Sequence, residues 1–178
     1  PMKLNVICLL ILWSSNILAI ENLPKTKINP GLLSNYWSAQ WIACPDDSGL
    51  DYGVYHFRKR YSVNTVHEEF IIRLSDDNRY RLFVNGQPVC FGPARGDLMH
   101  WRFESIDIAT LLKTGENTLA AVVWNFAGLK PWAQHSLQTA FILQGNTGIE
   151  RIADSNQSWK VTKNKAYKPA SAGPEKTG

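Results

Sequence analysis

The feature that most constrains this chain is an alternation of apolar residues with a period of two. Tyr80, Leu82 and Val84 alternate in this way up to the dipeptide Asn85-Gly86. Type I′ hairpin turns favour Asn-Gly because both central residues need a positive φ angle. Alternation that ends in such a turn predicts a β-hairpin, whose returning strand runs over residues 88–91.

The same period recurs along most of the chain. Eight or so short strands with turn signals between them, and a single helical turn, indicate an all-β sandwich of two sheets. The helical turn is predicted at residues 108–113, with Asp107 as its N-cap and Gly115 as its C′ glycine. Outside the hairpin, strands are predicted at residues 54–63, 70–74, 101–106, 117–126, 139–144, 149–153 and 158–161.

The first residues have the pattern of a secretory signal peptide. Lys3 supplies a positive start, residues 6–12 form an apolar run, and Ser14, Ser15 and Ala19 are the small residues expected near a cleavage point. The run is too short to span a membrane, and no other segment is apolar for long enough. The sequence therefore predicts an exported protein, periplasmic or extracellular, without a membrane span.

Four segments are expected along the 178 residues. Residues 1–19 are the predicted signal peptide, and residues 20–35, which contain two prolines, are predicted to be an extended lead-in. Residues 36–162 are the predicted β-sandwich module, a domain of ordinary size. Residues 163–178 are rich in Lys, Ala, Pro and Gly and are predicted to be a linker or a truncated end.

The formal net charge of +4 is unevenly distributed. Five lysines lie at or beyond residue 160, where only Glu175 opposes them, and Lys3 belongs to the predicted signal peptide. Residues 20–159 are close to neutral and contain no stripe of Lys and Arg, which argues against a groove that neutralises phosphates. No nucleic-acid partner is expected.

Patterns typical of catalytic and metal sites are missing from the sequence. Glycoside hydrolysis needs two carboxylates across the bond, and only Asp97 and Glu104 could approach each other across a loop. The four histidines have no metal-ligand spacing, and no Gly-x-Ser-x-Gly occurs. We expect no catalytic residue and no cofactor. A structural Ca²⁺ held by Asp46, Asp47 and Asp51 stays open, because their spacing is not diagnostic.

Two cysteines remain once the predicted signal peptide is removed. Cys44 and Cys90 could form a disulfide, since an exported protein meets an oxidising environment. They could equally stay free and buried, which is the commoner use of isolated cysteines. Without CxxC spacing they do not form a metal site.

Two long connections between predicted strands carry the candidate ligand-binding residues. Loops between sandwich strands commonly contact ligands, and sugar recognition combines an aromatic plane with polar groups for the hydroxyls. Trp132 is the predicted platform, whereas Trp124 lies on a strand and is expected in the core. A loop Trp can equally pack against a neighbouring domain. The candidate carbohydrate-binding residues are Arg95, Asp97, His100 and Trp101 in residues 92–101, and Trp132 and Gln134 in residues 127–136.

Four short motifs occur together in the body of the chain. They are Val84-Asn85-Gly86, the segment 92–97 (Gly-Pro-Ala-Arg-Gly-Asp), Gly115-Glu116-Asn117, and the segment 120–124 (Ala-Ala-Val-Val-Trp). In this combination they resemble the N-terminal jelly-roll, galactose-binding-like module of bacterial α-L-rhamnosidases. The resemblance covers residues 38–161.

The resemblance implies an accessory role. In that family the hydrolytic residues lie in a separate helical-barrel domain, which is not part of this chain. The implied partners are a catalytic helical-barrel domain of the same parent chain and rhamnose-containing glycans. The alternatives are a free-standing carbohydrate-binding module and, ranked last, a catalytic domain in its own right.

Overall fold

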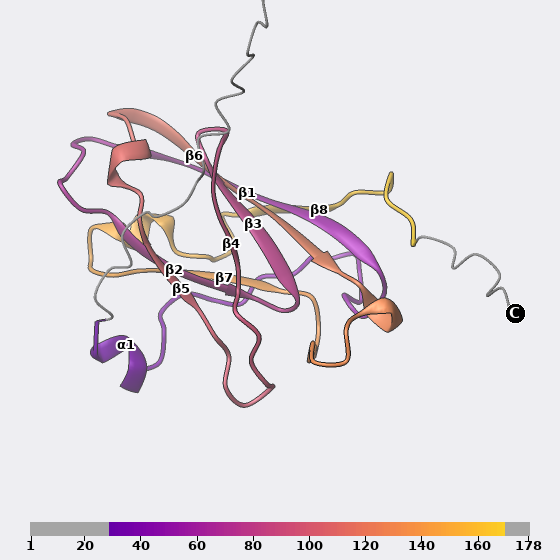
Figure 1. Cartoon of the computed structure of the whole chain (residues 1–178). Coiled ribbons are helices and arrows are strands. Elements are labelled where there is room, and N and C mark those ends of the chain that lie inside the picture. Colours follow the sequence, from indigo (N-terminus) through magenta and orange to yellow (C-terminus); the bar gives the residue numbers. More distant parts are fainter. Residues whose placement is uncertain (1–28, 170–178) are drawn as a thin grey trace, which may run out of the picture.

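Eight strands form the body of the molecule. They are β1 (Gly53–Val63), β2 (Ile71–Asp76), β3 (Arg79–Val84), β4 (Gln87–Gly92), β5 (Glu104–Asp107), β6 (Gly115–Asn125), β7 (Phe141–Gly145) and β8 (Lys160–Lys163). They pair into a five-stranded sheet, in the order β4-β3-β6-β1-β8, and a three-stranded sheet, in the order β5-β2-β7 (Figure 1). All named pairings are antiparallel. The prediction of an all-β, two-sheet sandwich is confirmed.

The computed structural model describes residues 29–169. The predicted signal peptide therefore lies outside the described residues, as does the end of the predicted linker. Within the described part, helical structure is limited to the short elements α1 (Gly31–Ser34), η1 (Ala109–Leu111), η2 (Ala127–Leu129) and η3 (Glu150–Ala153). The sequence predicted one helical turn, and η1 lies within it.

Two helical turns occur where other structure was predicted. The element α1 lies in the segment predicted to be extended, and the Asn29 side chain accepts a hydrogen bond from the Gly31 N–H at its start. Residues 149–153 were predicted as a strand, but residues 150–153 form η3. There the Glu150 carboxylate accepts the Thr147 N–H at 2.7 Å, which closes a local turn. Such local hydrogen bonds compete with strand pairing.

The Asn-Gly hairpin between β3 and β4 forms as predicted. Asn85 and Gly86 have φ angles of 50° and 83°, as a type I′ turn requires. Asp107 accepts the Ala109 N–H at 2.9 Å, but the N-cap of η1 is Ile108, one residue later than predicted. Gly115 has the expected positive φ of 91°, but it begins β6 rather than ending the helical turn.

The core lies between the two sheets and is rich in aromatic rings. Because successive side chains of a strand point to opposite faces, each strand contributes every second residue to it. The ring centroid of Phe141 (β7) is 5.5 Å from those of Phe57 (β1) and Trp159, and 6.1 Å from that of Tyr80 (β3). Phe141 thus joins the small sheet to the large one and fixes the strand ends from which the loops of the site emerge.

Trp124 is not in the core, contrary to the prediction. Its neighbours Val123 and Asn125 are buried, so the Trp124 indole points to the outer face of the five-stranded sheet, where it is half-buried. It borders a depression of about 240 Å³ together with Tyr52 and Tyr167. The segment around it is apolar on both faces, which hides the alternation in the sequence.

Cys44 and Cys90 are both free thiols, so the disulfide left open by the sequence does not form. Burial of Cys90, whose strand β4 borders the core, raises the pKa of its thiol to about 12. Such a thiol is almost fully protonated at neutral pH and is a weak nucleophile.

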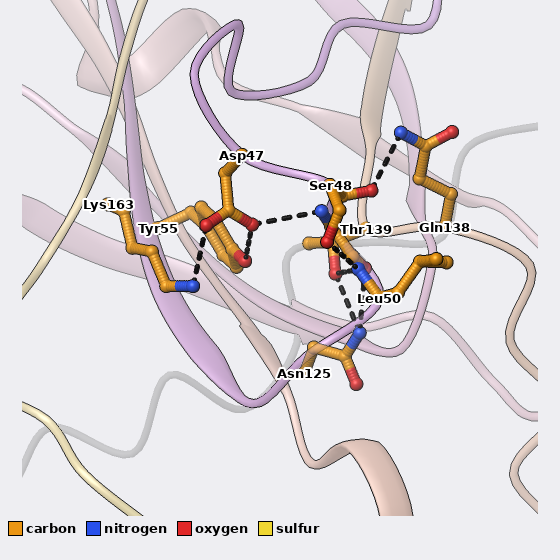
Figure 2. Close-up of polar contacts among 9 residues, drawn as sticks. Asp47, Ser48, Leu50, Tyr55, Asn125, Gln138, Thr139 and Lys163 are labelled. Atoms are coloured by element: carbon orange, nitrogen blue, oxygen red, sulfur yellow. Dashed lines mark hydrogen bonds and ion pairs between the residues drawn. The ribbon is translucent and has the colours of Figure 1, made fainter.

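Asp47 anchors the loop that precedes β1 (Figure 2). Its carboxylate accepts hydrogen bonds from Tyr55 Oη and from Lys163 Nζ of β8, both at 2.6 Å, and from the Gly49 N–H at 2.9 Å. Burial would raise the pKa of Asp47, but these hydrogen bonds outweigh it and lower the pKa to about 2. Both oxygens of Asp47 are bound by protein donors, so its carboxylate links the loop that precedes β1 to strands β1 and β8.

The same loop is also held from the other side. Asn125 Nδ2 donates to the Gly49 carbonyl at 3.0 Å and to Thr139 Oγ1 at 2.8 Å, and Thr139 Oγ1 donates to the Gly49 carbonyl at 2.7 Å (Figure 2). The connection that carries Trp132 and Gln134 is thereby fixed at its C-terminal end.

Candidate functional site

The two loops that carry the predicted ligand-binding residues meet beside the end of β2. Parts of residues 92–103 and of residues 126–140 line a small cavity there, the loop cleft. Its volume of about 10 Å³ is room for about one water molecule. The polar and aromatic side chains that line the loop cleft are Asp76, Asp97, Trp101, Arg102, Gln134 and His135.

Asp97, Trp101 and Gln134 are thus brought together, whereas the other three predicted residues do not line the cleft. Arg95 is exposed, and its side chain makes no hydrogen bond or ion pair within residues 29–169. Trp132 is fully exposed. His100 points its Nδ1 at the Asp97 carboxylate, 2.9 Å from Oδ1.

Asp97 and Gly96 shape the first loop. The Asp97 carboxylate accepts the N–H groups of Met99 and His100 at 2.8 and 2.9 Å. The hydrogen bond with the His100 ring, and then that from the Met99 N–H, lower the pKa of Asp97. A Cβ atom at Gly96 would lie 2.4 Å from the His100 carbonyl oxygen, so only glycine fits. Asp97 therefore holds the loop in shape and has little capacity left to act as an acid or base.

Asp76 is the chemically unusual residue of the loop cleft. It is 1% exposed, and neither carboxyl oxygen has a hydrogen-bond partner in the described part of the chain. Burial, and secondarily the nearby Asp77, raise the pKa of Asp76 well above its ordinary value, while Arg79 acts in the opposite direction. A buried polar group without a partner costs stability, and such residues cluster at functional sites.

The residues after Asp76 clamp the second loop. The Asp77 carboxylate accepts the N–H groups of Leu137 and Gln138 at 2.5 and 2.6 Å. Asn78, which has a positive φ of 92°, donates from its side chain to Ser136 Oγ at 3.0 Å. The sequence identified this stretch only as a turn, and its role as a clamp depends on contacts about sixty residues away.

A larger concavity, the aromatic groove, lies next to the loop cleft on the outer face of the three-stranded sheet. Its volume is about 600 Å³, which lies within the range of small-molecule sites. Ser75 of β2 and Ile142 of β7 form part of its floor, and Arg102 borders both cavities. Its walls are formed by Tyr36, Trp37, Trp41, Met99, Trp101 and Phe103.

Two indoles form a corner in this groove. The rings of Trp41 and Trp101 lie 5.4 Å apart at an interplanar angle of 58°. Trp37 packs edge-on against Phe103 at 5.3 Å and donates its indole N–H to the Leu32 carbonyl. Aromatic planes beside polar groups are what sugar recognition requires. Tyr36, Trp37 and Trp41 were not among the predicted site residues, although three aromatic residues within six positions are a visible signal in the sequence.

Neither a group of metal-ligating side chains nor a membrane-spanning helix is found in the described residues. No group of three or more His, Cys, Asp or Glu side chains within residues 29–169 is arranged to hold a metal ion. Asp47, one of the three residues considered for calcium, is bound by Lys163 instead. No helix in this part of the chain is long and apolar enough to cross a membrane.

Comparison with known proteins places the fold. No family model and no curated protein matches the sequence. Among solved structures, the chain is similar to a GH78 family rhamnosidase of Bacillus sp. GL1, with 24% identity and a TM-score of 0.65, over 72% of this chain and 14% of that one. It is also similar to an α-L-rhamnosidase of Streptomyces avermitilis in complex with L-rhamnose, with 21% identity and a TM-score of 0.51, over 76% and 13% of the two chains.

A lectin has a similar fold. The Pleurotus ostreatus lectin matches with 20% identity and a TM-score of 0.50, over 72% of this chain and 35% of the lectin. The resemblance to a rhamnosidase module, inferred from short motifs, is thus confirmed at the level of the fold. The chain is a β-sandwich domain with the fold of one small part of α-L-rhamnosidases.

Proposed function

We propose that this chain is the non-catalytic accessory domain of an exported glycoside hydrolase that resembles α-L-rhamnosidases. The observation that carries the proposal is the asymmetry of the match, which spans 72% of this chain but 14% of the Bacillus rhamnosidase. A catalytic helical-barrel domain elsewhere in the same parent chain would cleave the substrate. This domain would support it and contact carbohydrate.

The carboxylates of the described residues support a non-catalytic role. A glycosidase places two carboxylates on either side of the sugar that is cleaved. Asp97 is bound by His100 and by loop amides, and Asp76 lies in a cavity with room for about one water molecule. Glu104, the possible partner of Asp97, accepts the Ala94 N–H at 3.3 Å. None of the three lines the aromatic groove.

The aromatic groove supports carbohydrate contact. A sugar ring that lay against Trp41 or Trp101 would bury its C–H face and leave its hydroxyls within reach of Arg102 and Ser75. A free-standing carbohydrate-binding module is the second candidate. It is favoured by the likeness to the Pleurotus ostreatus lectin.

The reading frame of the native gene separates the two candidates. A frame that continues past residue 178 into a long helical domain, whose rhamnosidase activity falls when residues 36–162 are deleted, is expected for the accessory domain. A stop codon at that point would overturn the accessory role and leave the free-standing module.

Sugar contact is tested by titrating the purified chain with rhamnose and rhamnose-containing glycans, followed by tryptophan fluorescence and calorimetry. Saturable binding that weakens about tenfold, or ~1.4 kcal/mol, in Trp41→Ala is expected, since the variant removes the aromatic surface on which the C–H face of the sugar is buried. Trp132→Ala is the matched variant outside the groove. Loss of binding in Trp132→Ala alone would place the sugar on the exposed loop instead, and no binding at millimolar sugar would remove carbohydrate contact from the proposal.

A further inference from the structure

The outer face of the five-stranded sheet gathers basic and aromatic side chains that the sequence spreads over more than eighty residues. Strand register places the outward side chains in rows across the sheet. One row contains Phe91, Arg81, Val122, His56 and Thr162, from β4 to β8. The next contains Pro88, Phe83, Ala120, Arg58 and Lys160. We call these two rows and their outward neighbours on the same strands the basic face.

Positive charge dominates the basic face. The charged side chains that point outward from its strands are five cations, Arg58, Arg60, Arg79, Arg81 and Lys160, and one anion, Glu116. The carboxylate of Glu116 lies 3.8 Å from Arg60 and so does not reach the others. Residues 20–159 are close to neutral in sum, but their cations gather on one face of the sheet because every second residue of β1 and β3 points outward.

Arg58 and Lys160 are the least expected pair on this face. They lie directly opposite each other on the adjacent strands β1 and β8, and both are exposed. Like charges directly opposite in a sheet are destabilising. No carboxylate of the described residues forms an ion pair with either side chain. An anionic ligand that bridges the two cations would relieve this repulsion.

Aromatic rings lie among the cations. The Arg81 guanidinium lies over the Phe83 ring, 5.7 Å from its centroid, and this contact holds it on the face. Phe91, opposite Arg81 on β4, is 77% exposed. The rim is completed by the half-buried Trp124. Cations that alternate with apolar rings suit a ligand that carries both anionic groups and apolar C–H surfaces.

We propose that the basic face binds a polysaccharide whose sugar units carry carboxylates. Guanidinium groups pair with carboxylates through directed hydrogen bonds, and the exposed rings offer surfaces to the C–H faces of the same sugars. The choice of a glycan over another polyanion rests on the proposed function. The site is separate from the aromatic groove, because the two lie on the outer faces of different sheets.

The test is native affinity electrophoresis of the full 178-residue chain through gels that contain polygalacturonate. A gel with highly methyl-esterified polygalacturonate is the matched ligand control, since it has the same backbone without most of the charge. The variant Arg58→Gln/Lys160→Gln removes the opposed cations. Lys113→Gln/Arg151→Gln removes the same charge from exposed positions elsewhere.

We expect polygalacturonate to retard the wild-type chain and the Lys113/Arg151 variant, and retardation to weaken with added salt. The Arg58/Lys160 variant should bind about tenfold more weakly, or ~1.4 kcal/mol. It should melt no lower than the wild type, because the like-charge pair is gone, and this excludes misfolding as the cause.

Three outcomes would overturn the proposal. They are equal retardation by the esterified polymer, unchanged binding in the Arg58/Lys160 variant, and binding of a single-stranded oligonucleotide at a salt concentration that abolishes polygalacturonate binding. Rhamnose titration of the same samples keeps the proposals apart. If rhamnose still binds while polygalacturonate does not, the proposed ligand of the basic face is refuted and the proposed function stands.

Discussion

The ammonium group of Lys59 lies 2.9 Å from the carbonyl oxygen of Asp154, in a side chain that is 7% exposed. Lys59 occupies an inward position of β1, on the core side of the sheet. Burial lowers the pKa of Lys59, and the nearby Asp154 carboxylate opposes this shift. The sheet therefore holds a cation where an apolar residue would ordinarily lie.

Lys59→Met should leave the free energy of unfolding at pH 7 unchanged or raise it by up to ~1 kcal/mol. The folded state disfavours the charged amine, so protonated Lys59 lowers stability at every pH below its shifted pKa. Stability then rises between that pKa and the ordinary value of 10.5. The Asp154 carbonyl is not left without a partner in this variant, because it still accepts the Trp159 indole N–H at 3.0 Å. Urea unfolding measures the free energy of unfolding, with the exposed Lys113→Met as the control. A decrease of more than ~2 kcal/mol in Lys59→Met would contradict the prediction.

The inward direction of Lys59 could have been predicted from the sequence. Phe57, Lys59 and Tyr61 have the same parity, so the alternation that predicts the strand also predicts that Lys59 points inward. The run Arg58-Lys59-Arg60 is easily taken for a solvated patch. The two-residue period of the strand predicts that Lys59 is buried while Arg58 and Arg60 are exposed.

Local chemistry explains which elements could be predicted. The Asn85-Gly86 turn was predictable because its φ angles are set by those two residues. The strand predicted at residues 149–153 failed because the Thr147–Glu150 hydrogen bond turns the chain there. The strand that contains Phe141 was predicted, but the contacts of Phe141 with three rings from distant segments were not.

The site depends on pairs far apart in the chain, which alternation cannot reveal. Trp41 and Trp101 meet although sixty positions separate them. Gln134 was predicted from its loop and lies at the loop cleft, where it donates to the Asn78 carbonyl at 3.3 Å. Trp132 was predicted for its loop and its aromatic ring, but it points away into solvent. Loop membership could be predicted, but side-chain direction could not.

Asp47→Asn should lower the free energy of unfolding at pH 7 by about 1–2 kcal/mol, because the pairing with Lys163 and Tyr55 is weakened. Since the pKa of Asp47 falls from 3.8 to about 2 on folding, this contribution is complete above pH 3.8 and is lost as the pH falls through about 2. Denaturant midpoints between pH 2 and pH 7 measure the effect. Asp46→Asn, at an exposed neighbouring position, should show no such dependence.

Phe141→Ala should destabilise the domain by about 3–5 kcal/mol, since it removes a fully buried ring that touches both sheets. Phe141→Leu should cost less than half as much because most of the volume is kept. Thermal melting followed by circular dichroism gives both values. Equal losses in the two variants would mean that the ring contacts, rather than the filled volume, determine the stability.

Gly96→Ala should distort the 92–101 loop without unfolding the domain. Its Cβ would approach the His100 carbonyl oxygen to 2.4 Å, so the backbone must move and the Asp97–His100 contacts must change. The loop is exposed, and we expect a stability change below ~1 kcal/mol together with a changed environment for Trp101. Tryptophan fluorescence and a urea melt test this, and an unchanged spectrum would contradict it.

Asp76→Asn should stabilise the domain at neutral pH. Folding raises the pKa of this carboxyl, so the folded state is penalised as the pH rises from 3.8 towards the shifted value. An amide carries no charge and escapes the penalty, so we expect a gain of about 1–3 kcal/mol at pH 7 that disappears below pH 3.8. Unfolding at pH 3.5 and pH 7 measures the difference. A variant that is less stable at both values would mean that the carboxylate has a partner, such as a bound water or cation, which the amide cannot keep.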